Sequence, residues 1–144
     1  MMGFIPDRAK SFTVYLQRRF GITLPGNVGV YFAKGLRVGN RGLMKSHIHG
    51  ELGYGACDLG FNPTNALIQN FGHLATRNVL DVEEDAAKAF AAGKDFECDM
   101  GRSTRYVIIR YKTHTVGMGY YDRDKKRVLN RIPEKRRREI INSI

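Results

Sequence analysis

The sequence predicts an α+β fold, and three observations lead to that prediction. Phe12, Leu16 and Phe20 recur at intervals of four, which is the spacing of one helical face. Residues 106–121 are dominated by Val, Ile, Thr and Tyr, which is typical of two strands joined by a tight turn. Hydrophobic residues make up 42% of the chain, which is enough to build a packed core around both patterns.

The first third of the chain is expected to hold one helix and two strands. The helix spans residues 7–19, with Pro6 in front of it and Gly21 ending it. A turn of Leu, Pro, Gly and Asn follows, and strands are expected over residues 28–32 and 36–38.

Glycine-rich sequence separates this region from a second helix. Between residues 39 and 60 we expect turns and short strands. Asn62 is then expected to cap a helix over residues 63–75 whose first residue is Pro63. Leu67 and Phe71 lie on one side of that helix.

The second half of the chain is expected to contain two helices and several short strands. Three acids, residues 83–85, stand where the positive end of a helix dipole favours carboxylates. They introduce a helix that runs to Ala92, with Gly93 as its natural C-cap. Pro133 opens a basic helix that runs to about residue 142. Strands are expected over residues 79–82, 96–98, 106–111 and 127–129. A further strand, the second of the hairpin, is expected to end at residue 121.

The hairpin within residues 106–121 is expected to be the centre of the fold. The run around Ile108 and Ile109 is apolar on both faces, so we expect both faces to be covered. The turn falls near residues 112–114. Gly117 and Gly119 lack side chains, which allows a bulge or a close neighbour in the second strand.

Positive charge is the strongest compositional signal. The chain has 24 basic and 14 acidic residues, a net charge of +10. Residues 123–138 hold nine basic and two acidic residues, or +7, whereas residues 79–122 hold six basic and eight acidic residues, or −2. Solubility alone can produce a basic protein, but such uneven placement favours a face that binds a polyanion, either nucleic acid or an anionic membrane.

Several classes of protein are disfavoured. No apolar run approaches the roughly 20 residues of a membrane span. Asp7, Arg8 and Lys10 stand where a signal peptide would be apolar. Cys57 and Cys98 are the only cysteines and form no disulfide pattern, so a cytoplasmic location is expected.

From residue 61 onward, the order of elements resembles the PUA domain, the RNA-binding module named after pseudouridine synthases and archaeosine transglycosylases. The features are a short strand, an alanine-rich helix closed by Gly93, and a strand pair with glycines at 117 and 119. The greatest likeness is to the PUA-like tail of the Sun-type RNA cytosine-5 methyltransferases. The residues that carry it are Asn62-Pro63-Thr64-Asn65, Ala75-Thr76-Arg77-Asn78-Val79, Tyr106-Val107-Ile108-Ile109-Arg110-Tyr111, Gly117-Met118-Gly119-Tyr120 and Asn130-Arg131-Ile132-Pro133-Glu134-Lys135-Arg136-Arg137.

The resemblance implies two parts and RNA binding. Residues 1–77 resemble the small α+β segment that precedes PUA in those methyltransferases, and residues 78–144 would form a PUA-like β-barrel with flanking helices. The methyltransferase body is not found in the sequence. No glycine-rich loop suited to S-adenosylmethionine follows a strand, and neither Cys57 nor Cys98 has the Pro-Cys or Thr-Cys setting of those enzymes. The chain is therefore expected not to be an enzyme and to need no cofactor.

The main candidates for RNA contact are the basic residues near the C-terminus, since Lys and Arg that neutralise phosphates release counterions. The alternative is a solvated helix end and a loose tail. These candidates are Lys125, Lys126, Arg127, Arg131, Lys135, Arg136, Arg137 and Arg138.

A second set follows from the resemblance, because PUA domains turn the corresponding helix and strand toward RNA. It consists of Lys88, Lys94, Arg102 and Arg105. The alternative is ordinary surface charge paired with Glu84, Asp95 or Asp99. Arg77 could contact phosphate, or it could satisfy the last carbonyls of the helix that it follows.

The aromatic side chains and the possible metal ligands also allow two interpretations each. The aromatic residues Phe96, Tyr106, Tyr111, Tyr120 and Tyr121 could stack on bases, but core packing is favoured. The possible metal ligands are His47, His49, Cys57 and His73. They lack a paired Cys-x-x-Cys or His-Glu-x-x-His motif, so no metal site is expected.

The resulting expectation is a non-catalytic RNA-binding protein for ribosomal or transfer RNA, associated with RNA modification or ribosome biogenesis. It would bind structured RNA through contacts with phosphate and 2′-OH groups. An RNA modification enzyme is a further possible partner, and no association with a membrane is expected. Two alternatives stay open. One is an interaction subunit that recruits a separate RNA methyltransferase, and the other is an enzyme acting through Cys57, His73 or His114.

Overall fold

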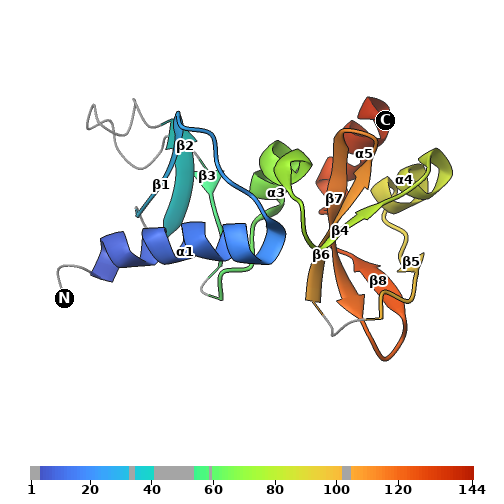
Figure 1. The fold of residues 1–144 in the computed structure, drawn as a ribbon. Helices are drawn as coiled ribbons and strands as arrows, with labels where there is room; N and C mark the ends of the chain where they lie inside the picture. The colour runs from blue at the N-terminus through green and yellow to red at the C-terminus, as the bar shows by residue number, and fades with distance from the viewer. Residues whose placement is uncertain (1–3, 33–34, 41–53, 59, 102–104) are drawn as a thin grey trace.

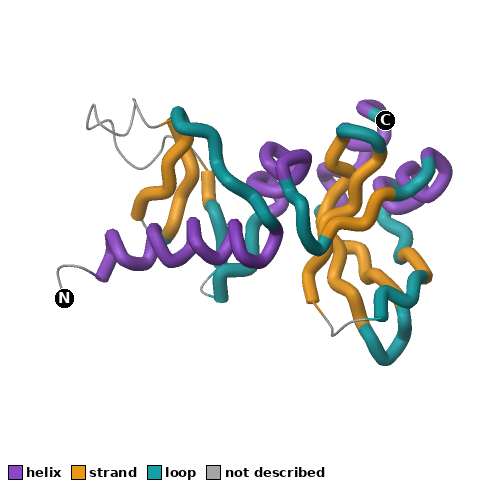
Figure 2. The backbone as a smooth tube through the Cα atoms, viewed as in Figure 1, coloured by secondary structure: helices purple, strands orange, loops and turns teal. Residues whose placement is uncertain are grey.

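The computed structural model describes residues 4–32, 35–40, 54–58, 60–101 and 105–144. Two groups of elements lie side by side along the molecule (Figure 1). The first contains α1 (Phe4–Phe20) and a three-stranded sheet, and the second contains a five-stranded sheet with two helices. The helix α3 (Asn65–Phe71) lies between the two sheets (Figure 2). The predicted α+β class is confirmed.

The first group is built on the apolar face of α1. Phe12, Leu16 and Phe20 are completely buried, as their spacing predicts. They lie against an antiparallel sheet in the order β1 (Val28–Phe32), β2 (Leu36–Asn40), β3 (Tyr54–Gly55). The helix begins before the predicted start, and Pro6 lies in its first turn, where a missing N–H is tolerated. Gly21 ends it with a φ of +66°.

The predicted cap of the second helix is wrong. Thr64, not Asn62, is the N-cap of α3, because its Oγ1 accepts a hydrogen bond from the Leu67 N–H at 3.2 Å. Pro63 is not the first helical residue, since it forms an isolated antiparallel bridge with Cys57. This bridge keeps the chain extended up to Thr64 and moves the helix start to Asn65. After α3, a short 3₁₀ turn, η1 (Gly72–Leu74), completes the predicted helical range.

The second group is a curled, five-stranded sheet in the order β4-β6-β7-β8-β5, which is consistent with the PUA-like β-barrel that the resemblance implies. Only β4 and β6 pair in parallel. The two helices are α4 (Glu84–Ala91), followed by Gly93 at a φ of +103°, and α5 (Glu134–Ser143). The strands are β4 (Val79–Asp81), β5 (Phe96–Glu97), β6 (Arg105–Tyr111), β7 (His114–Asp122) and β8 (Arg127–Asn130).

The β6–β7 hairpin separates two hydrophobic cores, which confirms that both of its faces are covered. Val107 and Ile109 point into the barrel core, whereas Ile108 and Met118 belong to the core of the first group. The two cores therefore share one hairpin. The division of the chain into domains of residues 1–77 and 78–144 stays a prediction.

The glycines of β7 act as the sequence predicts. The register shifts by one residue opposite Ile109 and Arg110, so β7 carries a bulge near Val116. A Cβ on Gly119 would collide with Val128 Cγ1 and approach Phe90 Cζ within 3.2 Å. The absence of a side chain there lets β8 and α4 pack closely on β7.

Within the described ranges, no helix is long and apolar enough to cross a membrane.

Candidate nucleic-acid interface

The basic residues near the C-terminus do not form one surface. Lys135, Arg136 and Arg138 are exposed on α5. Lys125 and Lys126 belong to the turn between β7 and β8, and Arg127 begins β8. Figure 1 shows α5 and this turn at opposite ends of the barrel. These cations therefore belong to two separate surfaces, either of which could contact RNA.

Several of these cations have acidic neighbours. Lys126 Nζ lies 3.6 Å from Asp99 Oδ2, and Arg127 Nη2 lies 3.0 Å from Glu97 Oε1. Arg136 pairs with Glu139 at 3.9 Å on the surface of α5. Exposed pairs of this kind contribute little stability and can exchange partners, so they do not prevent phosphate binding.

Arg137 differs from its neighbours on α5 because it is half-buried. Its guanidinium lies against Gly93, where an added Cβ would come within 2.5 Å of the Cζ and Nη1 atoms. This contact packs α5 onto the end of α4. Arg137 therefore has a structural role in addition to its charge.

The second set of candidates is dispersed. Lys88 forms the expected surface pair with Glu84 at 3.8 Å, and Lys94 is exposed after the end of α4. Arg102 lies outside the described residues. Arg77 donates a hydrogen bond from Nη1 to the Arg18 carbonyl at 3.0 Å. It therefore satisfies a carbonyl at the end of α1, and not one of the helix that precedes Arg77 in the chain.

Arg105 and Arg131, in contrast, come together with a residue of the first helix. With Arg19 they line an open groove of about 590 Å³ between α1 and the β6–β7 hairpin. Tyr15, Asn62, Tyr106 and Tyr120 complete the lining. We call this the hairpin groove.

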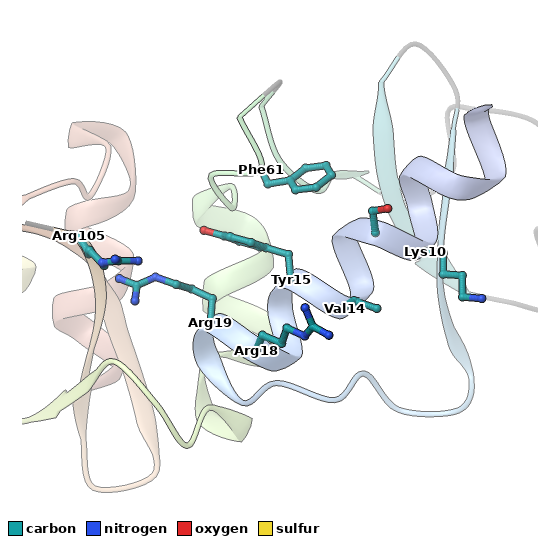
Figure 3. A pocket seen from close by; sticks show the side chains of 8 residues that line it. Lys10, Val14, Tyr15, Arg18, Arg19, Phe61 and Arg105 are labelled. Carbon is teal, nitrogen blue, oxygen red and sulfur yellow. The ribbon is translucent and has the colours of Figure 1, made fainter. Parts of the chain in front are cut away.

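A second hollow of about 690 Å³ continues from the hairpin groove along α1. Both are lined by Tyr15, Arg19 and Arg105. The extension adds Lys10, Ser11, Val14, Arg18 and Phe61 (Figure 3). Figure 3 shows Arg105 approaching α1 from β6, with its guanidinium directed toward that of Arg19.

Hydrogen bonds to backbone carbonyls hold the end of α1 beside the second group of elements. The Asn78 side chain donates to the Arg19 carbonyl, and the N–H groups of Thr76 and Arg77 both donate to the Phe20 carbonyl. These bonds satisfy carbonyls that the end of a helix leaves without an intrahelical partner. In addition, Arg19 Nη2 donates to the Tyr106 carbonyl at 2.9 Å. The end of α1 is therefore held against β4 and β6.

Two tyrosines form an aromatic wall in the hairpin groove. Tyr106 and Tyr120 are paired across β6 and β7, with ring centroids 4.9 Å apart and an interplanar angle of 67°. The Arg131 guanidinium lies 5.5 Å from the centroid of Tyr120. Both rings are half-buried, so each has one part in the protein and another facing the groove.

The other aromatic candidates pack into the fold. Tyr121 is completely buried in the barrel core, and its hydroxyl accepts a hydrogen bond from the Met100 N–H at 3.1 Å. Phe96 and Tyr111 pack against the same core. These three residues therefore pack in the core, as the sequence favours, whereas Tyr106 and Tyr120 line a groove.

Phe61 is held at the rim of the extension by an unusual backbone. Its φ of +63° is left-handed, which a bulky residue rarely adopts. Asp58 supports the turn by accepting hydrogen bonds from the N–H groups of Gly60 and Asn62 and from the Asn62 side chain. The Phe61 ring then packs on Phe12 and Tyr15.

The electrostatic character of the combined groove is positive. Among its described lining residues, five are Lys or Arg and none is Asp or Glu. Burial raises the pKa of the Tyr15 hydroxyl, and the nearby charges of Arg19 and Arg105 act in the opposite direction. The charge of Asp58 also raises the pKa of Tyr15, but the Asp58 carboxylate accepts hydrogen bonds within its own turn. The groove is suited to an anion with flat, polarisable groups.

The possible metal ligands are not brought together where they can be placed. His47 and His49 lie outside the described residues. His73 is exposed in η1, and Cys57 is half-buried, with a pKa that burial raises to about 11. In the part of the chain that is described, no three His, Cys, Asp or Glu side chains gather in a way that could hold a metal ion.

Sequence reasoning missed half of the groove. It named none of Lys10, Tyr15, Arg18, Arg19 and Phe61 as a candidate for RNA contact. A signal was present, since Tyr15 flanks the Phe12–Leu16–Phe20 face and lies one helical turn before Arg18 and Arg19. That pattern alone does not show which element faces the helix.

Comparison with known proteins confirms the resemblance. Residues 77–138 match the family described as the Methyltransferase RsmF PUA domain. A stretch of 74 residues, 51% of this chain, is 31% identical to the ribosomal RNA small subunit methyltransferase F of Aeromonas salmonicida (strain A449). The stretch covers only 15% of that relative's length. The family match covers the PUA domain and no catalytic domain.

Proposed function

From the PUA domain in residues 77–138, we propose that this protein binds ribosomal or transfer RNA without catalysing a reaction itself. It would act in RNA modification or ribosome biogenesis. The observation that carries the proposal is the family match, because it is a match to the RNA-binding module of a methyltransferase family. The net charge of +10 supports it independently.

Binding of RNA through positive charge has a consequence that can be measured. Each phosphate neutralised by Lys or Arg releases condensed counterions, so the affinity falls linearly with salt on logarithmic scales. Contacts with phosphate and 2′-OH groups hold a structured RNA without reading its sequence. We therefore expect strong salt dependence and modest sequence preference.

The test is a titration of labelled ribosomal and transfer RNA at about 50 and about 200 mM salt, where a protein with several phosphate contacts loses at least tenfold in affinity. Saturable binding that weakens with salt supports the proposal. No binding at the lower salt concentration, or binding that salt leaves unchanged, overturns it.

Two variants with equal loss of charge then separate the two C-terminal surfaces. One carries Lys135→Ala and Arg138→Ala on α5, and the other carries Arg123→Ala and Lys125→Ala in the β7–β8 turn. Arg137 is left intact because it packs against Gly93. The surface that contacts RNA is the one whose variant binds more weakly and shows a smaller salt slope.

A second candidate function is an interaction subunit that recruits a separate RNA methyltransferase. The observation that favours it is the similarity to a segment amounting to only 15% of a ribosomal RNA methyltransferase. Capture of a methyltransferase from cell extract that persists after nuclease treatment would support this function. Capture that nuclease abolishes would leave RNA as the link between the two proteins.

A further inference from the structure

We infer that the hairpin groove and its extension bind unpaired nucleotides of the RNA, with phosphates at Arg19, Arg105 and Arg131 and bases against Tyr106 and Tyr120. This inference rests on the proposed function, because it gives the RNA a second, specified surface. The groove lies on the first-group side of the β6–β7 hairpin, whereas α4 and α5 pack on the barrel core beyond it (Figure 1).

The arrangement of charge is the first argument. Arg19 and Arg105 come from α1 and β6, and their guanidinium groups are directed toward each other (Figure 3). Two like charges that approach across an open groove repel, and an anion between them removes that repulsion. Arg131 adds a third guanidinium on the β8 side of the same groove. Guanidinium groups suit phosphate because they can donate two parallel hydrogen bonds.

The aromatic wall is the second argument. Tyr106 and Tyr120 lie in the same groove as these cations, and Tyr15 links it to the extension, where Phe61 lies. Surfaces that bind single strands combine a positive groove along the backbone with aromatic rings on which bases stack. The Arg131 guanidinium lies over the Tyr120 ring, so a cation that can bind phosphate stands next to a ring on which a base can stack.

The chemistry of RNA decides between unpaired and duplex segments. In a duplex the bases are stacked inside the helix, so tyrosines at the side of a groove cannot reach their faces. Unpaired nucleotides present base and phosphate together, and they are the usual target of aromatic stacking. A groove that offers both cations and tyrosines, with no carboxylate among its described lining residues, therefore favours unpaired RNA.

The test compares two RNA probes on one set of variants. The probes are a labelled ten-nucleotide oligouridine and a blunt RNA duplex of similar charge. The groove variant carries Arg105→Gln and Arg131→Gln, both at exposed side chains. The control variant carries Lys112→Glu at the exposed turn between β6 and β7, which lowers the net charge by the same two units at a residue that lines neither the hairpin groove nor its extension.

The expected result is a loss of at least tenfold in affinity for the oligouridine in the groove variant, with less than threefold for the duplex. The salt slope for the oligouridine should fall by about 1.4, since two phosphate contacts are lost and each contributes about 0.7 on a single strand. Tyr120→Leu should weaken oligouridine binding by about fivefold or more while leaving the salt slope unchanged, because stacking and not charge is removed.

Each outcome separates the inference from the proposed function. If the wild type binds neither probe nor the ribosomal and transfer RNAs, the proposed function fails. If the wild type binds RNA but the groove variant matches the control variant on both probes, only the groove inference fails. Equal losses on oligouridine and duplex also overturn it, since the groove would then not select unpaired nucleotides. Thermal unfolding of every variant shows whether a loss of affinity comes from the groove or from a loss of folded protein. If Tyr120→Leu does not fold, the variant with Arg105→Gln and Arg131→Gln still tests the inference.

Discussion

The Asn130 side chain donates from Nδ2 to the Phe90 carbonyl at 2.6 Å and so joins the end of β8 to α4. The same amide nitrogen donates to the Lys94 carbonyl at 3.0 Å, and Oδ1 accepts from the Ile132 N–H at 2.9 Å. One side chain thus connects α4, the end of β8 and the turn into α5. It also fixes the chain next to Arg131, which reaches the hairpin groove.

Asn130→Ala should lower the free energy of unfolding by about 1–3 kcal/mol, because it leaves partly buried carbonyl and amide groups without their partner. Urea denaturation followed by circular dichroism measures the change. Asn142→Ala is the control, since Asn142 is exposed near the end of α5 and should shift stability by less than about 0.5 kcal/mol. Equal stability of the two variants would contradict the role given to Asn130.

Gly119→Ala should destabilise the protein by about 1–3 kcal/mol, as overpacking does in a filled core. The added methyl group would collide with Val128 and crowd the Leu129 carbonyl and the Phe90 ring. Gly26→Ala provides a matched control, because its Cβ would meet nothing within 4 Å. Comparing the urea midpoints of both variants with that of the wild type tests the prediction, and a wild-type midpoint for Gly119→Ala would refute it.

Asp58→Asn should destabilise the protein near pH 6, and by progressively less as the pH is lowered. Hydrogen bonds from the Asn62 side chain and from the Asn62 and Gly60 N–H groups lower the pKa of Asp58. A lowered folded-state pKa contributes stability above the unfolded value of about 3.9, and the contribution disappears as pH falls through the folded value. The difference in urea midpoint between wild type and variant should therefore shrink on acidification.

The exposed Asp124 serves as the control for this experiment. Asp124→Asn removes the same charge without breaking the turn that holds Phe61. A pH-independent difference for Asp58→Asn would show that the carboxylate does not stabilise that turn.

Cys57 should react slowly with thiol reagents at neutral pH. Burial raises its pKa to about 11, so at pH 8 only about one molecule in a thousand carries the reactive thiolate. In a Cys98→Ser variant, the alkylation rate should keep rising with pH up to about 11. A rate that levels off below about pH 10 would contradict the raised pKa. The Cys57→Ser variant, which leaves the half-buried Cys98, provides the comparison.

Local sequence predicted most helices and strands because their signals are local. The spacing of Phe12, Leu16 and Phe20 identified the buried side of α1, and β-branched and aromatic residues identified the hairpin. The cap of α3 escaped this reasoning. Asn62 and Thr64 are both good capping residues, and only the pairing of Pro63 with Cys57 decided between them.

The candidate site was predictable only in part. Arg105 and Arg131 were named among many basic residues, and Tyr106 and Tyr120 among the aromatics. Their common position depends on how α1 lies against β6 and β7, which the spacing of residues along the chain does not contain.

The helices and strands, the resemblance to a PUA domain and the excess of positive charge can all be recognised along the chain. The position at which the charge gathers depends on the folded arrangement. Most of the C-terminal cations divide between two ends of the barrel, whereas Arg131 meets Arg19 and Arg105 in one groove. The physical reason is that the two faces of the hairpin bury two different cores, and the bonds from residues 76–78 fix the end of α1 beside it.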